Sequence, residues 1–244
     1  MEKKMQALDS VHAKALSCWK ADNLLQEKIV VSAKPLTAEE AIGKPDDMDY
    51  PIQQGKEHLI EAVFNGHKGQ AFTASRGTFS GTLEEIAALP LSDDFNRAVF
   101  VATLNAVSCA QHTATNTIHC KDNAPKECAQ KLSEYIKNKY DECKITIIGF
   151  QPAMAEALHT VFQVRLVDLD PQNIGLVKRG VLVEGQEKTG DAIAWADVLL
   201  VTGTTLANNS IDLFLTDKPV IFYGTTIAGA AAYMNWERFC PMSD

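Results

Sequence analysis

The fold of this chain is decided by the stretch Ala196-Asp-Val-Leu-Leu-Val-Thr-Gly-Thr-Thr-Leu-Ala-Asn-Asn-Ser210. Residues 198–201 are continuously apolar, as in a strand that is covered on both faces of a parallel sheet. Small and hydroxyl-bearing residues follow at once, in the turn Thr202-Gly-Thr-Thr205. In an open α/β sheet, ligands bind at the carboxyl ends of the strands. The stretch therefore predicts a buried strand with a binding site at its carboxyl end.

The residues of this turn suit a ligand. Gly203 allows a positive φ or a close approach of the backbone, and the threonine hydroxyls can both donate and accept hydrogen bonds. Favourable N-cap residues follow at Asn208, Asn209 and Ser210, and they predict a helix over Ile211–Leu215. The free N–H groups at such a helix start would favour an anion. The same residues can equally serve only to satisfy a turn and a helix cap.

The composition is that of an ordinary globular protein with an acidic balance. The 244 residues are enough for one large or two modest domains, and 46% of them are hydrophobic. The net charge of -8 argues against a nucleic-acid partner or an anionic membrane surface. Because neither a signal peptide nor an apolar run of membrane length is present, we expect a cytoplasmic protein without a membrane span. A homodimer is the default assembly.

The first half of the chain predicts strands and short helices, an α+β pattern. Helical spacing, capping boxes and one Asn-Gly turn carry this prediction. The expected elements are a helix over residues 2–27, a strand over 29–33, capping boxes at Thr37 and Thr82, a loop over 43–55, a hairpin over 59–74 and a helix over 94–110.

The second half alternates strands with helices, which predicts a parallel, doubly wound sheet. The expected strands are 144–148, 164–169, 198–201 and 219–222, and the expected helices are 127–139, 153–161 and 189–196. Three of the strand ends carry small residues, at Gly149, at Thr202–Thr205 and at Gly224–Thr226. Such ends lie along one edge of a parallel sheet, so we expect the three turns to line one crevice.

A dinucleotide fingerprint is absent from the first of these turns. Gly149 is followed by Pro152 where a glycine-rich loop would continue, although Asp168 stands near the position of a ribose-binding acid. A nucleoside cofactor such as a methyl donor therefore stays open, beside the simpler interpretation that Asp168 caps a strand end. Arg76, in the turn after the hairpin, could hold an anion across a domain cleft or could be an ordinary surface arginine.

A group of cysteines and histidines offers a second kind of site. Cys109, His112, His119, Cys120 and Cys128 fall within a short stretch, and the first two could share one face of a helix. Thiolates together with imidazole suit zinc, copper or another thiophilic ion. The spacing matches no known finger or ribbon, so buried cysteines with surface histidines is the simpler interpretation.

The chain resembles the family known as the putative heavy-metal chelation domain, a former domain of unknown function. The resemblance rests on Ile-Gly-Phe-Gln-Pro152, on Val-Asp-Leu-Asp-Pro171, on the Thr-Gly-Thr-Thr-Leu-Ala-Asn stretch and on Tyr-Gly-Thr-Thr226. The first half is similar to the lead domain of that family, which is itself similar to the N-terminal domain of enolase. The resemblance thus implies an α/β fold, with an enolase-N-terminal-like α+β domain over residues 1–92 and a Rossmann-like parallel-sheet domain over 93–244. It also implies a helical junction at about 93–140 and a site between the domains.

The resemblance and the strand ends together give a set of candidate ligand-binding residues. They are Gly149, Pro152, Asp168, Thr202, Gly203, Thr204, Thr205, Asn208, Gly224, Thr225 and Arg76. Ser210 stands where the family usually has threonine, and the last turn lacks the proline and serine of the family pattern, so that part of the pocket differs.

We expect these residues to bind a small anionic or metal-chelating ligand, with a role in heavy-metal chelation or metal-cofactor metabolism. Two alternatives stay open. One is a transferase-like enzyme that uses a nucleoside cofactor. The other is direct binding of a heavy or transition metal ion by Cys109, His112, Cys120 and Cys128.

Overall fold

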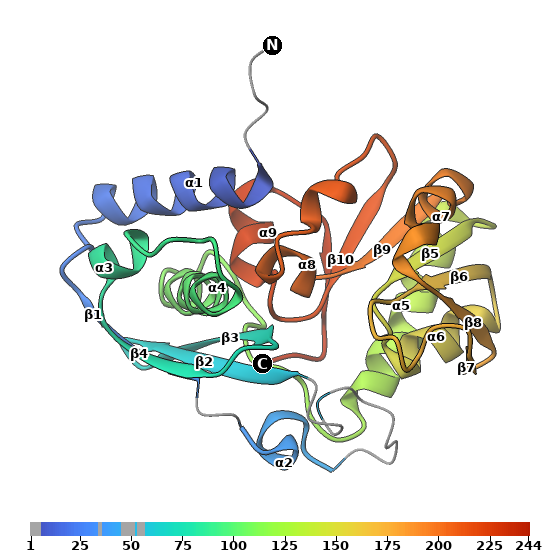
Figure 1. Ribbon diagram of the computed structural model, residues 1–244, viewed down its shortest axis with the longest axis horizontal. Coiled ribbons are helices and arrows are strands. Elements are labelled where there is room, and N and C mark those ends of the chain that lie inside the picture. The colour runs from blue at the N-terminus through green and yellow to red at the C-terminus, as the bar shows by residue number, and fades with distance from the viewer. Residues whose placement is uncertain (1–5, 34–35, 45–51, 53–56) are drawn as a thin grey trace.

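The computed structural model describes residues 6–33, 36–44, 52 and 57–244, and it contains two sheets (Figure 1). One is a four-stranded antiparallel sheet of order β3-β2-β1-β4, and the other is a seven-stranded sheet of order β11-β10-β9-β5-β6-β8-β7. The predicted α/β class is therefore confirmed. None of the helices in the described ranges combines the length and the apolar character that a membrane crossing requires.

The antiparallel sheet is built around the predicted hairpin. Its strands are β1 (Lys28–Ala33), β2 (His58–Phe64), β3 (His67–Thr73) and β4 (Gly77–Thr82). The turn between β2 and β3 has φ of 48° at Asn65 and 81° at Gly66. Two successive positive φ angles are what a two-residue hairpin turn requires, and Asn-Gly adopts them at low cost. The register that follows pairs Phe64 with His67.

Four helices accompany this sheet, namely α1 (Ala7–Ala21), α2 (Ala38–Ile42), α3 (Leu83–Ala87) and α4 (Asp94–Ala110). Both predicted capping boxes are present, at Thr37 and at Thr82. The first helix is shorter than predicted because it ends at Ala21 and Asn23 then takes a φ of 58°. Its expected start, like most of the loop expected over residues 43–55, lies outside the described residues.

Helix α4 is the central element of the molecule, and it has the bounds predicted from the sequence. It lies across one face of the antiparallel sheet, with α1 on its other side (Figure 1). Trp19 of α1 packs on Phe100 of α4 with ring centroids 6.1 Å apart. At Gly69 of β3 the two backbones touch, since a Cβ atom there would stand 2.1 Å from the backbone nitrogen of Ala106.

The second sheet is parallel as predicted, except for the antiparallel pair β7–β8. Its strands are β5 (Lys144–Ile148), β6 (Gln163–Val167), β7 (Val177–Lys178), β8 (Val181–Glu184), β9 (Val198–Thr202), β10 (Val220–Tyr223) and β11 (Arg238–Phe239). The helices that go with it are α5 (Ala124–Tyr140), α6 (Pro152–His159), α7 (Thr189–Trp195), α8 (Thr204–Ala207) and α9 (Ala228–Met234). The sequence patterns did not predict β7, β8, β11 or α9, each of which is short.

Both faces of the parallel sheet are covered, which explains the continuous apolar run of β9. Val198 and Leu200 belong to a core that they share with α5 and α6, whereas Leu199 and Val201 belong to the core that contains α4 and α9. The second of these cores also includes apolar residues of the antiparallel sheet, so one hydrophobic core connects the two sheets. The domain boundary expected near residue 92 stays a prediction.

The helix predicted over Ile211–Leu215 is wrong. The helix after β9 begins directly at Thr204, with Gly203 as its N-cap and Asn208 as its C-cap. Only a three-residue 3-10 turn follows, at Ile211–Leu213. The Asn208 side chain is used locally, since its Oδ1 accepts hydrogen bonds from the Ser210 backbone nitrogen at 3.1 Å and from Ser210 Oγ at 2.6 Å. Such side-chain turns compete with helix capping at Asn and Ser.

Candidate functional site

A pocket of about 610 Å³ lies at the carboxyl edge of the parallel sheet. Its walls come from the turns that follow β5, β6, β9 and β10, and from the end of β3 in the other sheet. The three turns with small residues thus line one pocket. The predicted ligand-binding residues that line it are Gly149, Asp168, Thr202, Gly203, Thr204, Thr205, Asn208 and Gly224.

Three of the predicted ligand-binding residues lie elsewhere. Pro152 is buried as the first residue of α6, and Thr225 is buried within the turn that follows β10. Arg76 follows β3, where its Nε donates to His58 Nε2 at 2.9 Å. These three do not line the pocket.

The backbone N–H groups of the turn after β5 already form hydrogen bonds within the protein. Gly149 has a φ of 91°, and a Cβ atom there would stand 2.8 Å from Thr202 Cγ2. Its backbone nitrogen donates to the Val167 carbonyl at 2.9 Å, and the Phe150 nitrogen donates to Asp168 Oδ2 at 2.7 Å. These donors are the ones that would face a phosphate in a nucleotide site. An anion in this turn would therefore compete with a carboxylate of the protein itself.

Asp168 links several pieces of chain at this edge. Besides Phe150, its carboxylate accepts the Asp170 backbone nitrogen at 2.8 Å and Asn173 Nδ2 at 3.3 Å. A carboxylate that accepts two or three N–H bonds is well satisfied without a ligand. The role of Asp168 as an acceptor for a ribose-like diol stays a prediction. Its hydrogen bonds hold together the turns that follow β5 and β6.

The hydroxyl groups of the next turn are likewise bonded to one another. Thr202 Oγ1 and Thr204 Oγ1 lie 3.0 Å apart, and Thr205 Oγ1 donates to the Thr202 carbonyl at 2.7 Å. Tyr223, on β10, donates its hydroxyl to the Gly149 carbonyl at 2.8 Å, and burial raises its pKa above the ordinary value. The floor of the pocket is therefore a rigid, preformed polar surface.

Glu57 is a pocket residue that the sequence did not reveal. It precedes β2 and lines the pocket from the side of the antiparallel sheet. Burial, together with the negative charges of Asp168 and Asp170, raises the pKa of Glu57 to about 7. A single glutamate beside a loop carries no local signal, and only the packing of the two sheets brings it to these aspartates.

The pocket is acidic. Its described lining residues include the carboxyl groups of Glu57, Asp94, Asp168 and Asp170, and no lysine or arginine is among them. Carboxylates that lie near one another favour a positive partner and disfavour an anion.

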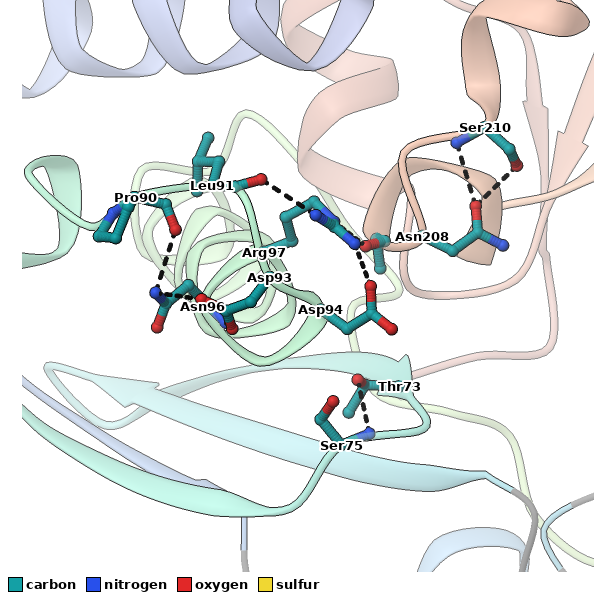
Figure 2. A network of polar contacts seen from close by, with 11 residues as sticks. Thr73, Ser75, Pro90, Leu91, Asp93, Asp94, Asn96, Arg97, Asn208 and Ser210 are labelled. Carbon is teal, nitrogen blue, oxygen red and sulfur yellow. Dashed lines mark hydrogen bonds and ion pairs between the residues drawn. The ribbon is translucent and has the colours of Figure 1, made fainter.

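Asp94 has a buried arginine, Arg97, beside it. The Arg97 guanidinium forms an ion pair with Asp94, donates from Nε to the Ala207 carbonyl at 2.6 Å and donates from Nη1 to the Leu91 carbonyl at 3.0 Å. Figure 2 shows Arg97 between Leu91 and Asp94, facing the end of α8 where Asn208 lies. This network fastens α4 to α8, and hence to the pocket wall.

We expect Arg97→Leu to lower the free energy of unfolding by about 2 kcal/mol, because it removes the donor to the buried Ala207 carbonyl and to the partly buried Leu91 carbonyl and leaves Asp94 without its cation. Urea denaturation would measure the change, with Lys188→Leu at an exposed position as the control. Equal unfolding midpoints for Arg97→Leu and wild type would show that the network does not hold the wall.

The four predicted metal ligands do not come together. Cys109 Sγ lies 3.7 Å from His67 Nδ1, and the His67 and His112 rings are 6.3 Å apart, outside the pocket. Cys120 and Cys128 line the pocket instead. Within the described part of the chain, no group of three or more His, Cys, Asp or Glu residues could hold a metal ion.

The separation has a structural cause. Just after α4 ends at Ala110, His112 takes a φ of 56°. The chain then runs beside β3, where the Gln70 backbone nitrogen donates to the Thr117 carbonyl at 3.0 Å. This run carries Cys120 away from Cys109. The direct metal site expected at Cys109, His112, Cys120 and Cys128 is thus not assembled.

His119 is the nitrogen donor that does line the pocket. Its Nδ1 lies 2.6 Å from the Cys120 carbonyl, so Nδ1 carries the proton and donates to that oxygen. Burial lowers the pKa of His119 to about 4, which outweighs the opposite effect of this hydrogen bond. The imidazole is therefore neutral at pH 7, with an unprotonated Nε2. The sequence placed His119 in the Cys/His group but gave no reason to prefer it.

Comparison with known proteins agrees with the fold and with the recognised motifs. Residues 131–231, which contain the Gly149–Pro152 turn, Asp168 and the Thr-Gly-Thr-Thr stretch, match the family model described as "Putative heavy-metal chelation". No curated protein matches the chain at a significant level.

Two solved structures share the fold. One is a protein of unknown function from the DUF364 family of Pyrococcus horikoshii, with a TM-score of 0.56, 15% identity, and coverage of 91% of this chain and 80% of that one. The other is a DUF364 protein from Desulfitobacterium hafniense, with a TM-score of 0.56, 9% identity, and coverage of 96% and 85%. The likeness of the first half to enolase stays a prediction. The part of the chain over residues 131–231 is thus similar to the family described as putative heavy-metal chelation.

Proposed function

We propose that the pocket binds a small cationic molecule, namely an amine-rich metal chelator or the metal complex of one. The observation that carries this proposal is the acidic lining, in which carboxyl groups from both sheets face a pocket of about 610 Å³. A positive ligand would also favour the charged form of Glu57, whose pKa is raised by burial and by the neighbouring aspartates.

The size of the pocket supports an organic ligand over a bare ion. Pockets of this volume accommodate small organic molecules, and they usually combine apolar walls with a few polar groups. Ile42, Ile52 and Phe72 supply such a wall here. Because the described residues offer no group of three metal ligands, most ligands of a bound metal would have to come from the chelator.

The acidic lining changes the expectation of an anionic ligand. Phe150 and Gly149 use their N–H groups on Asp168 and Val167, and the described lining residues hold no lysine or arginine. A nucleoside cofactor is supported less well for the same reason, since its phosphate or ribose would compete with bonds that Asp168 already makes. The metal-chelating part of the expectation is the part that the geometry supports.

Calorimetric titration with metal-free triethylenetetramine, a cationic chelator, and with citrate, an anionic one, tests the proposal. We expect saturable 1:1 binding of the amine and none of citrate. Glu57→Gln should weaken amine binding by about tenfold, because it removes a carboxylate that faces the ligand. Glu134→Gln, on the exposed side of α5, removes the same charge away from the pocket and should have no effect. Binding of citrate and not of the amine would overturn the proposal.

A further inference from the structure

We propose that His119 Nε2 is the protein ligand that completes the coordination of a metal carried into the pocket by an amine chelator. This inference rests on the proposed function, and it assigns the atom that would distinguish a metal-loaded chelator from an empty one. It needs one donor from the protein, since the chelator supplies the rest.

The hydrogen bond at Nδ1 of His119 leaves Nε2 as the nitrogen that can bind a metal. Because Nδ1 donates to the Cys120 carbonyl at 2.6 Å, the lone pair of the neutral imidazole is confined to Nε2. Metal-binding histidines commonly donate their second nitrogen to a carbonyl or carboxylate, which fixes both the tautomer and the ring orientation. His119 shows this arrangement although the described residues contain no group of three or more His, Cys, Asp or Glu that could hold a metal ion.

Three further contacts hold the ring in place. The His119 backbone nitrogen donates to Gln70 Oε1 at 2.8 Å, and the ring meets Phe72 edge-on with centroids 5.2 Å apart. The preceding residue, Ile118, exchanges two backbone hydrogen bonds with Asp244, of 2.8 and 3.1 Å. A donor fixed in this way loses little entropy when it binds.

The thiols of the pocket are poorer candidates than this imidazole. Cys120 and Cys128 are both buried thiols. Only a thiolate is a good metal ligand, so a thiol must lose its proton before it binds a metal. His119 Nε2 needs no deprotonation, so it is the group ready to bind.

Two zinc complexes of equal charge test the inference. Diethylenetriamine leaves one tetrahedral position of Zn²⁺ open, whereas triethylenetetramine supplies four nitrogens. We expect the wild-type protein to bind the zinc–diethylenetriamine complex at least about tenfold more tightly than the triethylenetetramine complex by calorimetry. In the ¹H–¹⁵N spectrum of histidine-labelled protein, the Nε2 resonance of His119 should shift only with the first complex.

His119→Gln should remove this preference and leave binding of the triethylenetetramine complex unchanged, which also shows that the variant is folded. His112→Gln, at an exposed histidine outside the pocket, is the matched control and should keep the preference. Equal binding of both complexes by wild type and His119→Gln would overturn the role of His119 and leave intact the proposal that the acidic pocket binds a cationic ligand. Failure of both complexes to bind would instead overturn the proposed function.

Discussion

Gly69→Ala is expected to destabilise the protein by more than about 4 kcal/mol. A Cβ atom at this position would stand 2.1 Å from the Ala106 nitrogen and 2.4 Å from the Ala102 carbonyl oxygen, both in the backbone of α4. No side-chain rotation can relieve contacts with backbone atoms, so α4 would have to move off the antiparallel sheet. That movement would disturb the core that connects the two sheets.

Asn105 shows why a shift of α4 would be costly. Its Nδ2 donates to the carbonyls of Gln70, Thr225 and Thr226 at 2.9, 3.0 and 3.1 Å, and its Oδ1 accepts from the Gly229 nitrogen at 2.7 Å. One buried amide thereby links the helix, β3 and the start of α9, and a displaced helix would leave these groups without partners.

Urea denaturation monitored by circular dichroism would measure the effect of Gly69→Ala. Gly190→Ala is the matched control, because the added Cβ would meet no atom within 4 Å beyond its chain neighbours and the backbone of its own helix, α7. Alanine there should be neutral or stabilise by about 0.5 kcal/mol, as expected for glycine in a helix. If Gly69→Ala unfolded at the same urea concentration as wild type, the close contact between β3 and α4 would be refuted.

Glu57→Gln is expected to make the protein more stable than wild type by about 3 kcal/mol at high pH. The pKa of Glu57 is raised from 4.5 to about 7, so the folded protein holds this proton more tightly than the unfolded chain. Its contribution is therefore full below the unfolded pKa of 4.5 and is lost as the pH rises to about 7. Glutamine is neutral at every pH, so the Glu57→Gln protein does not lose this stability as the pH rises.

The measurement is the free energy of unfolding of both proteins at about pH 5 and about pH 8. The difference between the two proteins isolates Glu57, because other groups such as His119 titrate equally in both. Glu134→Gln controls for the loss of one surface charge. Stability profiles that run parallel over this range would mean that burial and the charges of Asp168 and Asp170 do not raise the pKa of Glu57.

The parts of the fold that follow from local pattern could be predicted from the sequence. The apolar periodicity of α4, the Asn65-Gly66 turn and the capping box at Thr82 act through neighbouring residues, and each is confirmed. The helix after β9 was misplaced because Asn208 can serve either a cap or a side-chain turn. Asn208 forms the side-chain turn because Ser210 supplies the donor and because α8, which begins at Thr204, has Asn208 as its C-cap.

The polar edge of the sheet could be predicted for a similar reason, since the carboxyl ends of parallel strands meet in any such fold. The sign of the charge there could not. Glu57 comes near Asp168 only because residues beside both sheets line one pocket, and His119 enters that pocket only because the chain after α4 runs along β3. Those contacts join residues far apart in sequence, which leave no local signature.

The proposed function requires this pocket to take a positive ligand. Titration with triethylenetetramine at about pH 7, performed in two buffers of different ionisation enthalpy, tests this requirement because it counts protons as well as binding. We expect 1:1 binding in which wild type releases more protons than Glu57→Gln, since the cation draws the proton from Glu57. Amine binding with equal proton counts in the two proteins, or no amine binding at all, would contradict it.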